Sequence, residues 1–189
     1  MQNLIRKEDN KMDISEKKVK ENLVYDGKIL KLYVDDAELS NGKITKREYC
    51  NHPGGVAIIP IDDDGNVTLV RQFRYPYGCE LLEIPAGKLE PGENPLECGI
   101  RELEEETGMK AEEFISLGVA YPSPGYVNEK LYLYMAKELS QGVANPDEDE
   151  FLNVIKMPFS QLFQMVMTDE IHDAKTVIAA LKAKFLIEG

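Results

Sequence analysis

The sequence predicts an α+β fold in which a mixed β-sheet is sandwiched between helices and an antiparallel β-hairpin forms an N-terminal extension. Segments with strand-like patterns follow one another in runs, with few helical segments between them, unlike the alternation of a doubly wound parallel fold. The length of 189 residues, 43% of them hydrophobic, suffices for one substantial core and leaves little room for a second.

The N-terminal part changes character near residue 23. Residues 1–22 are highly charged and weakly periodic, so we expect either a frayed arm or a short surface helix. From Leu23 to Cys50 the pattern has period two and is interrupted by Asn41-Gly42, which predicts a hairpin with a type I′ turn. We therefore divide the chain into an arm and hairpin, residues 1–53, and a main domain, residues 54–189.

The main domain contains further strand and helix signals. Apolar or alternating runs bounded by turn residues predict strands at 56–60, 66–73, 81–84, 114–121, 130–137 and 151–157. Helical periodicity predicts helices at 95–107, 159–167 and 174–186.

The charge balance argues against a nucleic-acid partner. Lys and Arg total 22 against 34 Asp and Glu, a formal net charge of −12, and such a surface repels phosphate backbones. An anionic small molecule stays compatible with this charge if a bound divalent cation reverses the local potential.

The cysteines and the hydropathy predict a cytoplasmic protein with no membrane partner. Cys50, Cys79 and Cys98 are odd in number and lack C-x-x-C spacing, so they cannot form a complete disulfide framework. No stretch approaches 18 consecutive apolar residues, and the start of the chain lacks the apolar core of a signal peptide.

The segment Glu83 to Met109, EIPAGKLEPGENPLECGIRELEEETGM, carries the strongest signal for chemistry. Asn94 and Pro95 suit the start of a helix, and Gly108 suits its end. On a helical wheel Leu96, Gly99, Ile100, Leu103 and Thr107 form an apolar face, whereas Glu102, Glu105 and Glu106 gather on another.

Three neighbouring carboxylates repel one another, so stability gives no reason to choose them. A divalent cation does, because Mg²⁺ prefers hard oxygen ligands, with substrate phosphates completing its shell. Arg101 lies four residues before Glu105 and can fix the rotamer of a carboxylate. A Glu-rich helix taken alone is more often a solvated face with scattered ion pairs.

The spacing resolves this choice through a family resemblance. Gly87, Glu93, Arg101-Glu102-Leu103, Glu105-Glu106 and Gly108-Met109 stand at the spacings of the Nudix box, so the chain resembles the Nudix hydrolases. The resemblance implies the Nudix fold and hydrolysis of a nucleoside diphosphate linked to another moiety, with Mg²⁺ as cofactor and Mn²⁺ as the alternative. It implies metal binding by the carbonyl of Ala86 and by Glu102, Glu105 and Glu106, with Glu105 also placing water, and supporting roles for Gly87, Glu93 and Arg101.

Outside the box, the chain looks like the ADP-ribose pyrophosphatase subgroup. Pro124 follows Gly108 by 16 residues in YPSPGY, a position that marks this subgroup, although a Ser-Pro-Gly turn alone is a weak signal. In this subgroup the catalytic base is a loop glutamate, which corresponds here to Glu148 or Glu150 in an acidic run that by itself reads as a solvated loop. The resemblance therefore implies a small nucleotide sugar, ADP-ribose, as substrate, with AMP and ribose 5-phosphate as products.

Several residues are candidates for substrate contacts. A planar guanidinium suits bidentate phosphate recognition, which favours Arg74 and, after it, Arg71 and Arg47, although the last two could equally be strand salt bridges. Glu83 matches an acid near the substrate or metals in related enzymes, against the alternative of a plain strand-end carboxylate. The set of candidate contacts is Arg74, Arg71, Arg47, Glu83, Pro124 and Gly125.

Adenine needs a stacking platform, and the chain has no Trp. Tyr25, Tyr33 and Tyr49 are substitutes in the hairpin region, although strand tyrosines more often pack against neighbours. Related enzymes form homodimers in which N-terminal strands complete the neighbour's site, so the resemblance implies a homodimer with the hairpin as its interface.

Two rival functions remain. One keeps the chemistry and changes the substrate to another nucleoside diphosphate sugar or a dinucleotide. The other is a nucleotide-sugar sensor without turnover, which the complete set of box carboxylates disfavours.

Overall fold

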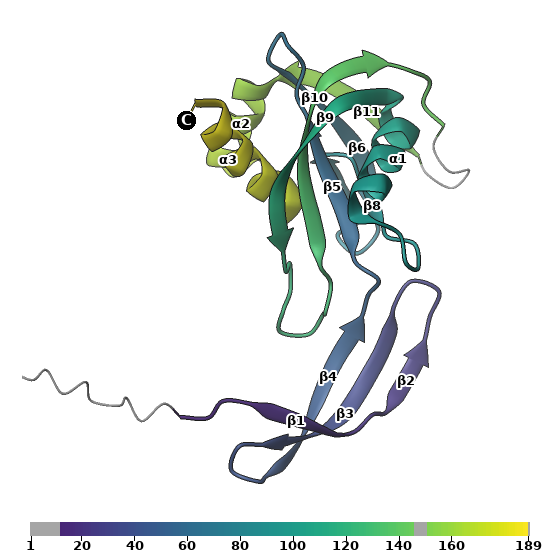
Figure 1. Cartoon of the computed structure of the whole chain (residues 1–189), viewed down its shortest axis with the longest axis vertical. Helices are drawn as coiled ribbons and strands as arrows, with labels where there is room; N and C mark the ends of the chain where they lie inside the picture. Colours follow the sequence, from purple (N-terminus) through teal and green to yellow (C-terminus); the bar gives the residue numbers. More distant parts are fainter. Residues whose placement is uncertain (1–11, 146–150, 189) are drawn as a thin grey trace, which may run out of the picture. The chain divides into compact units, whose positions relative to one another are not determined.

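The computed structural model describes residues 12–145 and 151–188. The chain divides into two units, one ending at Asn51 and the other beginning at His52. The first unit contains the strands β1 to β4, and the second contains β5 to β11 with the helices α1 to α3 (Figure 1).

The N-terminal unit is an antiparallel sheet built around one long strand. The central strand β3 (Lys31–Leu39) pairs along one edge with β4 (Ile44–Asn51). Its other edge pairs in succession with β2 (Leu23–Asp26) and β1 (Glu16–Lys20). The alternatives of a frayed arm or a surface helix are therefore wrong for Glu16–Lys20, because β3 supplies that segment with a strand partner; residues 1–11 lie outside the described part.

The expected hairpin is confirmed, but its turn is not of type I′. The N–H of Gly42 donates to the carbonyl of Leu39 at 2.8 Å, and the N–H of Leu39 donates to that of Lys43 at 2.9 Å. Gly42 has a φ of 79°, whereas Asn41 does not have the positive φ that a type I′ turn demands. Only one residue needs the left-handed conformation here, and the glycine adopts it.

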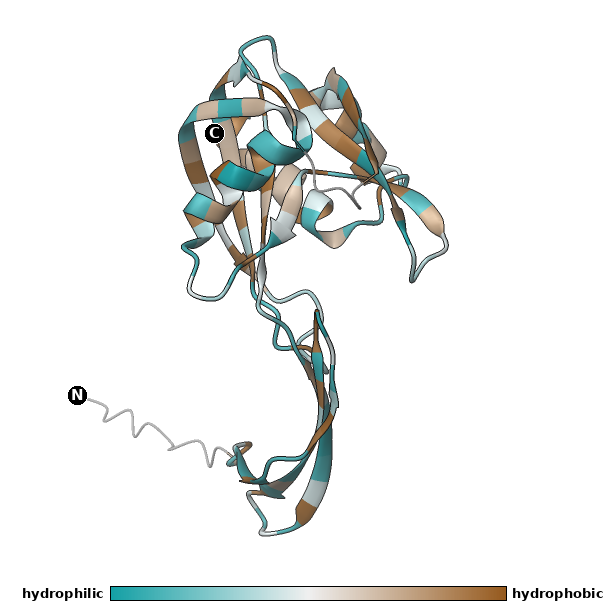
Figure 2. Cartoon of the chain, turned by 90° about the vertical axis from the view of Figure 1, so that its right-hand side faces the viewer, coloured by the Kyte–Doolittle hydropathy of each residue, from teal (hydrophilic) through white to brown (hydrophobic). Residues whose placement is uncertain are grey.

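The N-terminal sheet has almost no core of its own. Among its described residues only Asp35 and Ala37 are buried. Figure 2 shows hydrophobic and hydrophilic residues side by side along these strands, and the exposed hydrophobic set contains Val19, Leu23, Val24, Tyr25, Ile29 and Ile44.

The second unit has two sheets and three helices. One sheet has the order β8 (Ala86–Lys88), β5 (Gly55–Pro60), β10 (Leu131–Gln141) and β9 (Met109–Ala120), with β5 and β10 parallel and the other pairs antiparallel. The other is antiparallel, with the order β11 (Leu152–Pro158), β6 (Asn66–Arg74) and β7 (Cys79–Glu83). The helices are α1 (Pro95–Thr107), α2 (Phe159–Met167) and α3 (Ala174–Glu188).

The first of these sheets is mixed and lies between helices, as Figure 1 shows, so the predicted α+β architecture is confirmed. Strand β5 is buried along its whole length because both of its faces are covered. Val56 and Ile58 pack with Cys98 and Leu103 of α1. The alternate residues Ala57 and Ile59 belong to the larger core, which includes Leu162 of α2 and Ala179, Ala180 and Ala183 of α3.

Strands β8 and β9 differ from the sequence expectations. Strand β8 has only three residues and was not expected. Strand β9 begins at Met109, five residues before the predicted start at 114, because α1 stops at Gly108 and the chain passes directly into the sheet.

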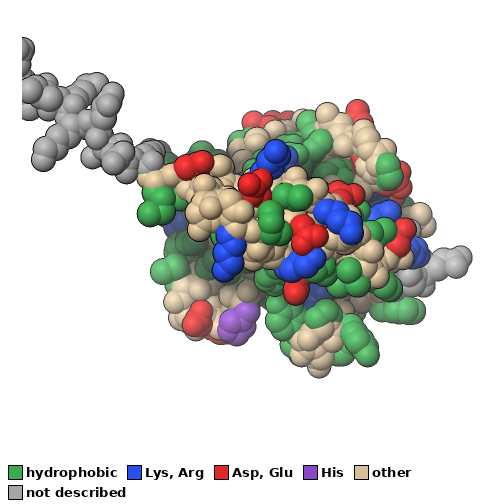
Figure 3. Space-filling model, turned by 90° about the horizontal axis from the view of Figure 1, so that it is seen from below, with side chains coloured by type: hydrophobic (Ala, Val, Ile, Leu, Met, Phe, Trp, Pro, Cys, Tyr) green, Lys and Arg blue, Asp and Glu red, His purple; other side chains and the backbone are tan. Residues whose placement is uncertain are grey.

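The surface chemistry agrees with the composition. Acidic and basic side chains lie close together, with apolar ones among them, on the face shown in Figure 3. Cys50, Cys79 and Cys98 are all free. In the described part of the chain, no helix is both long and apolar enough to cross a membrane.

Candidate functional site

Helix α1 begins and ends where the sequence predicts. The Asn94 side chain accepts a hydrogen bond from the N–H of Leu96 at 2.8 Å, and Pro95 occupies the first turn. At the other end, Gly108 is left-handed and its N–H donates to the carbonyl of Glu104 at 2.8 Å. These two caps fix the position of the glutamates along the helix.

The buried face of α1 differs from the expected one. Ile100 was assigned to the packing face but is 44% exposed, whereas Glu102 and Glu106 are only 8% and 3% exposed. The buried face of α1 includes these carboxylates because glycines let the helix approach the sheet closely. A Cβ added to Gly99 would stand 3.2 Å from the Val56 side chain.

Two carboxylates of α1 lie directly against the backbone of β8. A Cβ added to Gly87 would stand 1.8 Å from the carboxyl carbon of Glu102, so any larger residue there would collide with that carboxylate. One strand residue earlier, the N–H of Ala86 donates to Glu106 Oε2 at 3.1 Å. The structure therefore brings Ala86, Gly87, Glu102 and Glu106 together.

Arg101 of α1 forms ion pairs with three carboxylates, two on the same helix and one, Glu93, just before it. Its Nε lies 3.1 Å from Glu93 Oε1, and its Nη1 lies 2.9 Å from Glu102 Oε1 and 2.7 Å from Glu105 Oε2. Partial burial by itself would lower the pKa of Arg101, but its hydrogen bonds to Glu93 and Glu105 and the charge of Glu102 outweigh this effect and raise the pKa. Hydrogen bonds from Arg101 and from the N–H of Glu90 lower the pKa of Glu93.

The chemistry of this cluster fits a divalent cation. Three carboxylates, from Glu93, Glu102 and Glu105, contact one guanidinium, and the carboxylate of Glu106 lies beside Ala86. The cluster therefore has an excess of negative charge on hard oxygen donors. Within residues 12–145 and 151–188, no three His, Cys, Asp or Glu side chains already form a group that could hold an ion. The Nη1 of Arg101 contacts both Glu102 and Glu105 and offsets part of their negative charge.

A second charged network surrounds Glu83, which is 1% exposed at the end of β7. Arg74 of β6 donates to it in a bidentate manner, with Nε at 2.8 Å from Oε1 and Nη2 at 2.7 Å from Oε2. Lys175 of α3 also donates to Oε2 of Glu83, and its amine lies 2.9 Å from Asp173 Oδ1. Glu83 is therefore a buried, doubly paired carboxylate rather than a plain strand-end charge.

The pKa values of this network follow from its contacts. Burial would raise the pKa of Glu83, but the hydrogen bonds from Arg74 and the charge of Lys175 outweigh it, so this pKa lies below its ordinary value. Hydrogen bonding to Glu83, with smaller contributions from the charges of Asp173 and Glu106, raises the pKa of Arg74. The influence of Glu106 indicates that the two clusters are electrostatically connected.

Sequence reasoning missed Lys175 and Asp173. The spacing of Asp173 and Thr176 signals a helix start, and the carboxylate of Asp173 does accept from the N–H and the hydroxyl of Thr176, at 3.0 and 2.6 Å. The contact of Lys175 with Glu83 joins residues 92 positions apart in the sequence, and no local sequence pattern predicts it.

The remaining candidate contacts belong to different elements of the chain. Arg71 and Arg74 are three residues apart on β6, so their side chains leave opposite faces of the strand, and Arg71 lines a shallow hollow with Glu80 and Asn153. Arg47 lies in the N-terminal unit, where it forms a strand salt bridge with Glu16 at 2.6 Å.

Pro124 and Gly125 occupy an exposed turn in the connection between β9 and β10. This turn is closed by the carbonyl of Ser123, which accepts from Tyr126 and Val127 at 3.2 and 3.0 Å.

The candidate bases Glu148 and Glu150 lie outside the described residues. The chain just before them is well anchored, because the N–H of Asn145 donates to the carbonyl of Glu105 at 3.0 Å. The candidate stacking residues lie in the N-terminal unit. There the rings of Tyr33 and Tyr49 stack on each other at a centroid distance of 5.1 Å, while Tyr25 is exposed.

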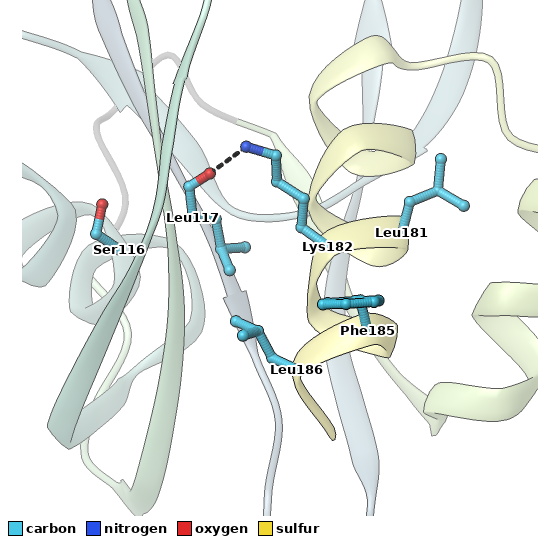
Figure 4. Close-up of a pocket in the computed structure, with 6 residues that line it drawn as sticks. All are labelled: Ser116, Leu117, Leu181, Lys182, Phe185 and Leu186. Atoms are coloured by element: carbon cyan, nitrogen blue, oxygen red, sulfur yellow. Dashed lines mark hydrogen bonds between the residues drawn. The ribbon is translucent and has the colours of Figure 1, made fainter. Parts of the chain in front are cut away.

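A separate hollow between β9 and α3 is apolar. Figure 4 shows Leu186 of α3 on the side of Leu117 of β9, with the amine of Lys182 bonded to the carbonyl of Leu117, and Leu181 and Phe185 of α3 also line the hollow. This hollow has no carboxylate among its lining residues, so it lacks the groups that hydrolysis with a metal requires.

Comparisons with known proteins agree with the geometry. Residues 51–181 match the NUDIX domain. The chain is 42% identical over 168 residues to an ADP-ribose pyrophosphatase of Bacillus subtilis (strain 168), covering 88% of this chain and 91% of that protein. It is 44% identical over 166 residues to a methanol dehydrogenase activator of Bacillus methanolicus, covering 87% and 90%.

One solved structure, titled as the crystal structure of an ADP compounds hydrolase, superposes with a TM-score of 0.81 over 95% of this chain and 98% of that chain. At 23% identity this likeness supports the fold alone. The carboxylate helix, the fold and the matched domain lead to one conclusion: the chain belongs to the Nudix family.

Proposed function

We propose that this protein hydrolyses the diphosphate of ADP-ribose to AMP and ribose 5-phosphate with bound Mg²⁺, for which Mn²⁺ is the alternative. The observation that carries the proposal is the complete Nudix box with Glu102 and Glu106 packed on β8. The relative named ADP-ribose pyrophosphatase, which is 42% identical over most of both chains, supports the choice of substrate.

The residues that would hold the metal are the carbonyl of Ala86 and the carboxylates of Glu102, Glu105 and Glu106. A bound divalent ion would polarise the diphosphate, neutralise developing charge and lower the pKa of attacking water. The carboxylates themselves contribute a fixed array of oxygen donors, because the caps of α1 and the contacts with β8 restrict their positions.

Arg74 is the protein cation proposed to bind the diphosphate. Two of its five N–H groups are committed to Glu83, and this bidentate pair fixes the plane of the guanidinium. Glu148 or Glu150 remains our proposal for the base that takes the proton from water. The anchoring of Asn145 to the backbone of Glu105 supports it, since Asn145 precedes the acidic run by only two residues in the sequence.

The first test is product analysis with purified protein and equal amounts of ADP-ribose, ADP-glucose, NADH, a flavin dinucleotide and diadenosine tetraphosphate. Chromatography should show AMP released fastest from ADP-ribose with Mg²⁺, and EDTA should abolish the release. Faster turnover of another compound would retain the chemistry but refute ADP-ribose, an outcome made relevant by the 44% identity to a relative named for a different activity. No turnover of any compound would favour the sensor.

Glu106→Gln should lower kcat on ADP-ribose more than tenfold, because it keeps the shape of the side chain and removes its charge from the proposed metal site. Glu104→Gln is the matched control: Glu104 lies on the same helix but pairs with Lys110 at 3.0 Å, and its loss should leave kcat within twofold. Turnover of Glu106→Gln within tenfold of wild type would refute the assignment of Glu106.

Gly87→Ala should weaken Mn²⁺ binding, measured by calorimetry without substrate, by roughly ten- to a hundredfold, as expected when the support of a ligand is disturbed. The new Cβ would stand 1.8 Å from the carboxyl carbon of Glu102 and displace this carboxylate. In Gly99→Ala the Cβ meets Val56 at 3.2 Å instead, so this variant measures the effect of a small displacement of the helix alone, and it should weaken Mn²⁺ binding less than Gly87→Ala does. Equal Mn²⁺ affinity in Gly87→Ala and wild type would exclude Glu102 as a ligand.

We also propose that the protein is a homodimer that uses its N-terminal sheet. Small sheets need their apolar face covered, and this sheet buries only Asp35 and Ala37 among its described residues. Sedimentation should give twice the chain mass of 21.3 kDa. Val24→Glu, on exposed β2, should shift the protein toward monomer, whereas Val143→Glu, an exposed valine of the other unit, should not. A wild-type monomer at micromolar concentration would contradict the proposal.

A further inference from the structure

The chain from Glu83 to Ala86 joins the two charged clusters, and neighbouring elements hold it at each residue. The N–H of Ile84 donates to the Thr176 hydroxyl at 2.9 Å, and the carbonyl of Pro85 accepts from Ile58 at 2.9 Å. Ala86 is bound to Glu106, as described above. The N-terminal turn of α3 therefore supports one end of this segment, and α1 supports the other.

Lys175 occupies a position that packing alone does not explain. Its side chain is 11% exposed, and its amine lies between the carboxylates of Glu83 and Asp173. Burying an ammonium group is unfavourable unless it is paired, so a lysine here needs anionic partners that offset its desolvation. Two cations, Arg74 and Lys175, then balance two carboxylates, Glu83 and Asp173, and the network is neutral.

The neutrality of this network determines how firmly Glu83 holds the guanidinium of Arg74. Arg74 and Lys175 share Oε2 of Glu83, and Asp173 also acts on Arg74 through its charge. Without Lys175, two buried or half-buried carboxylates would compete for the one guanidinium. Arg74 would then lose the single bidentate geometry that leaves its Nη1 without a hydrogen-bond partner in the described part of the chain.

We propose that Lys175 is a positioning residue for substrate binding: by neutralising Glu83 and Asp173, it keeps the guanidinium of Arg74 oriented toward the diphosphate. This inference rests on the proposed function, because it takes the diphosphate as the ligand of Arg74. It assigns to α3, outside the Nudix box, a part in recognising the substrate. The alternative is that Lys175 only fastens α3 to β7.

A double-mutant cycle separates the two roles. Lys175→Met removes the charge and keeps most of the length, and it should lower kcat/KM at least tenfold. In the Arg74→Ala background the same change should cost less than threefold, because the residue through which Lys175 acts is already absent. A fastening role would instead reduce kcat/KM by the same factor in both backgrounds, and that additivity would overturn the proposal.

Three further variants complete the design. Lys175→Arg keeps the charge and should recover most of the lost kcat/KM. Lys182→Met is the matched control on the same helix: the Lys182 amine binds the carbonyl of Leu117, away from Glu83, and its loss should change kcat/KM less than twofold (Figure 4). If thermal melting shows that Lys175→Met is unfolded at the assay temperature, Lys175→Gln replaces it in the cycle.

The activity of the wild-type protein distinguishes failure of the Lys175 proposal from failure of the proposed function. The cycle is run with whichever panel compound the wild type hydrolyses fastest, so a substrate other than ADP-ribose corrects the proposed function without affecting the test of Lys175. An active wild type with an additive cycle refutes the role of Lys175 alone. A wild type that hydrolyses none of the compounds refutes both.

Discussion

Burial of two carboxylates against a strand backbone constrains the rest of this structure. Glu102 and Glu106 project from α1 onto Ala86 and Gly87 of β8, where a buried charge is tolerable only if neighbouring groups compensate it. The compensation here is local: a backbone N–H for Glu106 and the Arg101 guanidinium for Glu102. The helix must lie close to the sheet for either contact to form, and glycines at positions 87 and 99 permit this approach.

The cluster around Arg101 and the network around Glu83 differ in their net charge. Around Arg101 the carboxylates outnumber the cation, which is unfavourable for folding but suited to a metal ion. Around Glu83 the charges balance, which suits a network that has to stay in place. The short segment from Glu83 to Ala86 connects the cluster with excess negative charge to the neutral network. Its residues are held by α3, β5 and α1.

Sequence reasoning succeeded where the information was local. The caps of α1, the existence of the hairpin and the mixed sheet between helices all followed from spacing and periodicity. Sequence reasoning failed where contacts between distant residues determine the structure. The helical wheel did not show that the carboxylate face of α1 is buried, because this burial depends on Gly87 in β8. The segment Glu16–Lys20 has the sequence of a charged arm, and it is a strand only because it pairs with β3. The partner of Lys175, Glu83, is known only from the packing of α3 against β7.

The contacts between α3 and β7 also bear on how the protein is made. Ile84 with Thr176, and Glu83 with Lys175, are pairs separated by 92 residues. A growing chain on the ribosome can form the carboxylate helix early, but it cannot fasten the segment before that helix until α3 has been synthesised. Assembly of the site therefore waits until α3, the helix that completes it, has been synthesised.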